Sequence, residues 1–127
     1  MNTLRGIFVA AAMLAAATLL VACGGAAVPV ATQPAGSILL TANLSTFAPT
    51  SVSAAADQAF TIWFDNKEVV AHNVRVTDAA GTTVGPVLEL FTGPAARPLD
   101  VPPLAAGTYS LLCDVHPEMR AELIAAN

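Results

Sequence analysis

Short segments in which every second residue is apolar fill the chain from residue 37 onward. In residues 60–65 the apolar side chains of Phe60, Ile62 and Phe64 recur with a period of two, which is the period of a half-buried β-strand. Similar segments predict strands at residues 38–44, 72–76, 87–91, 109–113 and 123–125, with a further strand beginning at 49–52. Turn-forming residues separate them, at 65–67, 78–81, 85–86, 93–94 and 102–103. The pattern predicts an all-β Greek-key sandwich without a helix of ordinary length.

Two polar residues share the parity of the predicted core. His72 has the parity of Val74 and Val76, and Cys113 has that of Leu111. Both lie near the end of a predicted strand, and alternate residues of a strand face the same side of its sheet. Two packed sheets would therefore bring His72 and Cys113 together at one end of the sandwich.

The first residues have the pattern of an export signal. Arg5 is followed by an uncharged apolar run at 7–20, and the sequence Leu-Val-Ala-Cys at 20–23 resembles a bacterial lipobox. We therefore predict a lipoprotein signal peptide at 1–22, a lipidated Cys23 with a flexible linker at 23–36, and one domain at 37–127. The alternative is an uncleaved signal anchor, although the run is short for a membrane span of about 20 residues. Either reading predicts a membrane-anchored protein outside the cytoplasm, in the periplasm or on the outer cell surface.

Composition narrows the choice of partners. The whole chain is 55% hydrophobic and 11% charged, and much of this bias lies in the first 22 residues. Apart from Arg5, all four Lys and Arg and all nine Asp and Glu follow residue 23, so the exported part carries five net negative charges. An acidic surface argues against binding to nucleic acid or anionic lipid, and it permits docking to a basic redox protein.

The segment at 113–119 spaces a thiol, an imidazole and a thioether three residues apart, as Cys113, His116 and Met119. After residue 23 the chain has one Cys, one Met and two His, the other being His72. Two His, one Cys and a weak axial Met form the ligand set of blue-copper electron-transfer sites. A structural zinc site would need four Cys or His ligands, and a thiol nucleophile has no use for the Met. Binuclear copper sites and multicopper oxidases need more Cys or His.

These motifs resemble those of the cupredoxins, the small blue copper proteins, over residues 37–127. The resemblance is carried by residues 60–66 leading to His72-Asn73-Val74, and by residues 106–109 leading to Cys113, His116 and Met119. The Cys-x-x-His-x-x-Met spacing is similar to the short ligand loop of amicyanin-like members. Two positions depart from the family pattern, because Ala71 and Val115 stand where many members have Pro.

The resemblance implies a role for each ligand. Cys113 binds one copper ion as thiolate, His72 and His116 complete the equatorial plane, and Met119 is the axial ligand. The ring edge of His116 is the electron port, exposed through an apolar surface. Ala71, Val115 and Pro117 are assigned to this apolar rim because they lie next to the ligands in the sequence.

Two further residues are expected to support the ligands. Asn73 is expected to tie the two ligand loops together and to offer its N–H to the sulfur. Val115 has a backbone N–H that a Pro would lack, and this N–H could also reach the sulfur. Such hydrogen bonds tune a copper potential, so Val115 is expected to give a higher potential than Pro.

We therefore expect a monomeric electron carrier, not an enzyme, that moves one electron between a donor and an acceptor redox protein. A lipoprotein for copper storage or delivery is the alternative, although the exported chain has no spare Met or His for metal transfer. A scaffold with a vestigial site is a third reading, which the complete ligand set disfavours.

Overall fold

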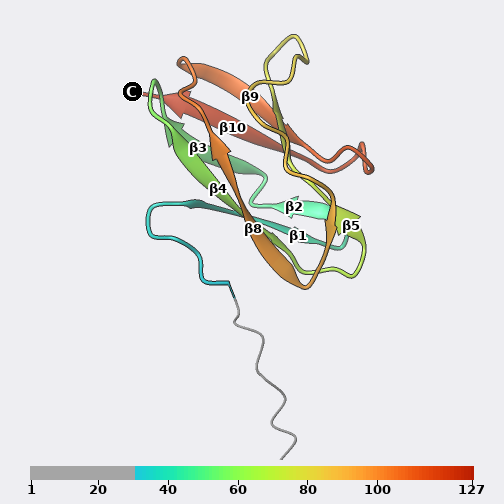
Figure 1. Cartoon of the computed structure of the whole chain (residues 1–127). Coiled ribbons are helices and arrows are strands. Elements are labelled where there is room, and N and C mark those ends of the chain that lie inside the picture. Colours follow the sequence, from blue (N-terminus) through green and yellow to red (C-terminus); the bar gives the residue numbers. More distant parts are fainter. Residues whose placement is uncertain (1–30) are drawn as a thin grey trace, which may run out of the picture.

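Two four-stranded sheets pack face to face in the computed structural model, which describes residues 31–127 (Figure 1). One sheet has the order β2-β1-β4-β8 and the other β3-β10-β9-β6, with a separate pair β5-β7. The strands are β1 (Ile38–Asn43), β2 (Thr46–Ala48), β3 (Ser51–Ala55), β4 (Phe60–Asn66), β5 (Ala71–His72), β6 (Arg75–Thr77), β7 (Phe91–Thr92), β8 (Ala95–Val101), β9 (Gly107–Leu112) and β10 (Arg120–Ala126). The predicted all-β sandwich is confirmed.

The core lies between the sheets and follows from the alternation of apolar residues. In β10, Ala121, Leu123 and Ala125 are buried while the residues between them are exposed. In β4, Ile62 and Phe64 are fully buried and belong to the same core cluster. β1 pairs with β4, and β3 with β10, in parallel, whereas the other pairs are antiparallel. Because parallel neighbours need crossover connections, the chain passes between the two sheets.

The strand predicted at 87–91 is wrong except for its last residue. Only Phe91 is in a strand, as the start of β7, and residues 86–90 form none. Segment 84–88 instead runs beside β6 through two hydrogen bonds, from Val84 N–H to the Val76 carbonyl and from Leu88 N–H to the Val74 carbonyl. Pro86 lies between them and has no N–H to continue a ladder.

Sequence reasoning missed β8, which contains Arg97 and Pro98 and shows no simple alternation. This strand is at the edge of its sheet, paired only with β4, where a Pro is tolerated because no neighbour requires its N–H.

The single strand predicted at 72–76 is divided between two sheets. His72 ends β5 and pairs with Phe91, whereas Arg75 begins β6 and pairs with Leu112. Asn73 and Val74 between them belong to no strand, although both are buried. The break allows the chain to leave β5 and join the second sheet immediately after His72.

The N-terminal predictions fall largely outside the described residues. The signal peptide at 1–22, the lipidated Cys23 and the first part of the linker precede residue 31. Residues 31–36 are exposed and contain no strand. Within residues 31–127 no helix is long and apolar enough to cross a membrane.

Candidate metal centre

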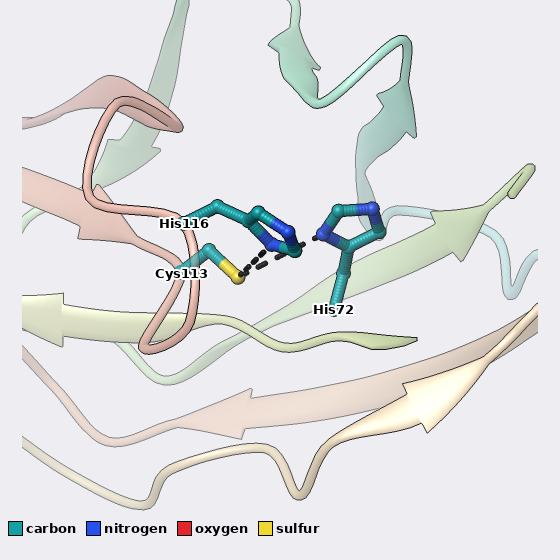
Figure 2. Close-up of side chains that lie close together, drawn as sticks. All are labelled: His72, Cys113 and His116. Atoms are coloured by element: carbon teal, nitrogen blue, oxygen red, sulfur yellow. Dashed lines mark hydrogen bonds between the residues drawn. The ribbon is translucent and has the colours of Figure 1, made fainter. Parts of the chain in front are cut away.

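The fold brings three of the four predicted ligands together around one point. The Sγ atom of Cys113 is 3.8 Å from Nδ1 of His72 and 3.7 Å from Nδ1 of His116. The two imidazole rings are tilted by 48° with centroids 4.6 Å apart. Figure 2 shows both Nδ1 atoms directed at the sulfur, His72 from β5 and the other two from the loop after β9.

Met119 closes the ligand loop through two backbone hydrogen bonds. Its N–H donates to the carbonyl of His116 at 2.9 Å, and its carbonyl accepts from the N–H of Cys113 at 3.3 Å. The side chain is 1% exposed and belongs to the same core cluster as Cys113. The tight loop therefore carries Cys113, His116 and Met119 on one short stretch of backbone.

The spacing of the three donors fits a metal ion. A metal about 2.3 Å from a thiolate sulfur and about 2.0 Å from an imidazole nitrogen, with ligands about 120° apart as in a trigonal site, requires about 3.7 Å between sulfur and nitrogen. The two measured distances agree with this value, and all three donor atoms lie within 4.8 Å of one another. A thiolate with two imidazoles is a set that fits copper, and a weak thioether ligand would complete the blue-copper set.

Asn73 directly follows the ligand His72, and Asp114 directly follows the ligand Cys113. Hydrogen bonds join these two residues. Asn73 Nδ2 donates to Asp114 Oδ2 at 2.6 Å, and the N–H of Asp114 donates to Asn73 Oδ1 at 2.9 Å. Arg75 adds a salt bridge to Asp114 Oδ1 at 3.0 Å. The side chain of Asn73 thus ties the His72 segment to the Cys113 loop. The sequence placed Asp114 beside the site as a solvated residue and gave Arg75 no role, because no sequence pattern pairs the two; the structure instead bonds Asp114 to Asn73 and Arg75.

The hydrogen bonds expected from the N–H groups of Asn73 and Val115 to the Cys113 sulfur stay predictions. The contacts described for this Sγ are those with the two imidazoles, at 3.8 Å from His72 Nδ1 and 3.7 Å from His116 Nδ1. The supporting role of Val115 stays a prediction, which the potential of Val115→Pro would test. Val115 itself is 48% exposed.

Glu68 is a neighbour of the site that sequence reasoning missed. Its Oε2 lies 2.9 Å from Nε2 of His72 and accepts the N–H of Ser45 at 3.0 Å. The Ser45 hydrogen bond, followed by smaller contributions from His72, holds the pKa of the Glu68 carboxyl below its ordinary value. The carboxyl group is therefore ionised at neutral pH. In an extended segment, an acidic residue four positions before a His does not indicate a contact between the two side chains. The fold alone brings Glu68 and His72 together.

Asn66 organises the segment that carries Glu68. Its Nδ2 donates to the carbonyls of Val70 and Phe91, each at 2.9 Å, and its Oδ1 accepts the N–H of Glu68 at 2.9 Å. The sequence predicted a turn at 65–67, but Asn66 is the last residue of β4 and is completely buried. The backbone pairing of β4 ends at Asn66, and the side-chain amide of this residue supplies the next hydrogen bonds to the backbone.

Comparisons with known proteins agree with this architecture. Residues 9–125 match the family model of the cupredoxin-like domain. Amicyanin from Paracoccus versutus superposes with a TM-score of 0.58 at 24% identity, covering 75% of this chain and 85% of that one. Auracyanin A from Chloroflexus aurantiacus, described as a blue copper protein, gives 0.61 at 21%, covering 72% and 98%. Reduced auracyanin from Roseiflexus castenholzii gives 0.62 at 17%, covering 75% and 100%. No curated protein matches the sequence.

The chain belongs to the cupredoxin-like family, because the family model spans nearly its whole length. The resemblance inferred from the ligand motifs is thereby confirmed. The solved structures are below 25% identical and establish the fold.

Proposed function

We propose that this protein is a mononuclear type 1 copper carrier that is tethered to a membrane and moves one electron between redox proteins outside the cytoplasm. His72, Cys113 and His116 would hold the ion in one plane, and Met119 would be its weak axial ligand. The observation that carries the proposal is the pair of Nδ1 to Sγ distances of 3.8 and 3.7 Å, which suit a trigonal site without rearrangement. The protein is an electron carrier and transforms no substrate.

Burial of the ligands supports electron transfer more than metal exchange. His72, Cys113 and Met119 are at most 3% exposed, whereas His116 is half-buried. When bound, copper supplies a one-electron Cu(II)/Cu(I) couple. The chain holds its ligands in a fixed frame through the Asn73 and Asp114 pair and the Met119 hydrogen bonds, which limits rearrangement between the two states.

The ring of His116 is the proposed exit for the electron, because it is the ligand that reaches the surface. Val115 and Pro117 on either side of it are exposed, and Ala71 beside His72 is half-buried. Val69 and Val70, in the loop before His72, are 79% and 45% exposed. An apolar rim of this kind lets a partner approach closely while water is excluded. The donor and acceptor would be redox proteins that reach the domain near a membrane.

The absorption spectrum of the purified protein with Cu(II) tests the copper assignment. We expect an intense blue band from thiolate-to-copper charge transfer, which Cys113→Ser abolishes. The matched control is Cys23→Ser, which removes the other cysteine of the chain and should leave the band unchanged. A wild-type protein without the band would overturn the assignment.

The lipid anchor is tested separately by Cys23→Ser in cells. The wild type should fractionate with membranes and incorporate a labelled lipid, and the variant should lose the lipid label. A wild type that carries no lipid label, together with a variant that remains membrane-bound, would refute the lipobox and favour an uncleaved signal anchor.

Copper storage or delivery remains the alternative function. A carrier of electrons should retain its copper against a chelator and exchange electrons rapidly with redox mediators. Rapid transfer of copper to a metal-free acceptor protein, with slow electron exchange, would instead favour copper handling.

A further inference from the structure

The carboxylate of Glu68 contacts the ring of His72 on the side opposite the candidate metal position. Nδ1 of His72 faces the Cys113 sulfur, and Nε2 lies 2.9 Å from Glu68 Oε2. In Figure 2 the second ring nitrogen of His72 points away from Cys113 and His116. The His72 side chain is 0% exposed and that of Glu68 is 19% exposed. The two nitrogens of this buried ring therefore face two different partners.

Glu68 is fixed at three points, so its carboxylate is not free to leave the ring. Its N–H donates to Asn66 Oδ1 at 2.9 Å, and its carbonyl accepts the N–H of Gly93 at 2.7 Å. Oε2 also accepts the N–H of Ser45 at 3.0 Å. Ser45 and the preceding Leu44 have φ values of 51° and 52°, a conformation that residues other than Gly rarely adopt. A turn in this conformation supplies the N–H that holds the carboxylate.

Within residues 31–127 the carboxylate of Glu68 forms no salt bridge with a Lys or Arg. In this part of the chain its one salt-bridge contact is His72, while Lys67 next to it pairs with Asp65. A carboxylate that is four-fifths buried is also poorly screened by solvent ions. Its negative charge therefore acts directly on the ring and on whatever the ring binds.

We propose that Glu68 is a positioning residue that holds the His72 proton on Nε2, keeps the Nδ1 lone pair directed at the metal, and lowers the reduction potential of the site. A neutral imidazole has one N–H and one lone pair, and an acceptor at Nε2 decides which nitrogen carries the proton. An anion beside the ligand also favours the more positive oxidation state, which is Cu(II). The effect on the potential rests on the proposed copper function, whereas the effect on the proton does not.

Two substitutions separate the hydrogen bond from the charge. Glu68→Met has a similar length but no acceptor, and Glu68→Gln keeps an acceptor oxygen without the charge. Glu118→Gln is the matched control, because Glu118 precedes the ligand Met119, is exposed, and makes no side-chain hydrogen bond within residues 31–127. It removes the same charge near the site without touching a ligand.

The proton is located first, by nitrogen NMR of the histidine rings in the copper-free protein. We expect the wild type and Glu68→Gln to hold His72 as the Nε2–H tautomer, and Glu68→Met to show a mixture of the two tautomers. A Glu68→Met protein with the wild-type tautomer would overturn the positioning role. This measurement decides the role even if the absorption spectrum shows no thiolate–copper band, so the two proposals can fail independently.

The reduction potential is measured next, in the copper-loaded proteins at one ionic strength. Glu68→Gln should raise the midpoint potential above that of the wild type, and by more than Glu118→Gln does. An equal or smaller shift than the control would overturn the charge effect. Because Glu68→Gln preserves an acceptor for both Ser45 and His72, this test remains available if Glu68→Met does not fold.

Discussion

Replacement of the buried Asn66 by Ala should destabilise the domain far more than its position at a strand end suggests. The substitution removes three hydrogen bonds of 2.9 Å, to the carbonyls of Val70 and Phe91 and from the N–H of Glu68. A buried hydrogen bond contributes about 1 kcal/mol, and a buried group left without a partner costs about 1–3 kcal/mol. Water can reach Val70, which is 45% exposed, but Phe91 is 6% exposed. We expect a loss of about 3 kcal/mol in the free energy of unfolding.

The assay is chemical and thermal unfolding of the copper-free protein, so that metal binding does not contribute. For a domain of this size a loss of about 3 kcal/mol corresponds to a fall of about 12–24 °C in Tm. Asn43→Ala is the matched control, because Asn43 is exposed and its side chain makes no hydrogen bond within residues 31–127. Its effect should stay within about 0.5 kcal/mol.

Equal stability of Asn66→Ala and Asn43→Ala would refute the reasoning. It would mean that the three hydrogen bonds of Asn66 contribute no more than those of a solvated side chain. A second consequence concerns the site, because Asn66 holds the N–H of Glu68. If the segment loosens, the His72 tautomer in Asn66→Ala should shift in the same direction as in Glu68→Met.

Two further substitutions test the frame of the site. Gly93→Ala should destabilise the domain by about 1–3 kcal/mol in urea unfolding, because a Cβ there would collide with the Asn66 carbonyl. Gly107→Ala is the control, because a Cβ at that position would make only ordinary van der Waals contacts. Equal losses of stability in the two variants would contradict the prediction. Asn73→Ala should cost about 2 kcal/mol by the same assay, since it breaks the reciprocal pair with Asp114. Arg75→Met, which removes only a partly exposed salt bridge, should cost about 0–1 kcal/mol; the reverse order would show that the salt bridge, not the amide, ties the loops.

The candidate ligands of the loop could be identified from the sequence because their spacing is local. Cys113, His116 and Met119 lie within seven residues, and a Met119 N–H bonded to the His116 carbonyl is a short-range contact. His72 followed from counting, since His116 is the one other His in the sequence. The shared parity of His72 and the apolar residues after it also predicted its burial, and the structure places it at 0% exposure.

The strand boundaries were harder to predict where pairing partners decide them. Residues 87–91 have the apolar composition of a strand, yet Pro86 has no N–H to continue a ladder and only Phe91 of this segment lies in a strand. β8 contains a Pro that only an edge position permits, and edge positions are a property of the assembled sheet. The alternation of apolar and polar residues within one segment does not show which strands will pair with it on either side.

The sequence by itself determined the fold class and the identity of the candidate ligands, because period-two alternation and ligand chemistry are properties of residue types and their spacing. The tertiary structure alone decided what surrounds those ligands. Glu68 reaches His72 only because Asn66 and Gly93 fix its backbone, and Arg75 reaches Asp114 only because β6 pairs with β9. Contacts of this kind depend on the register of distant strands, and a single strand's sequence does not specify that register.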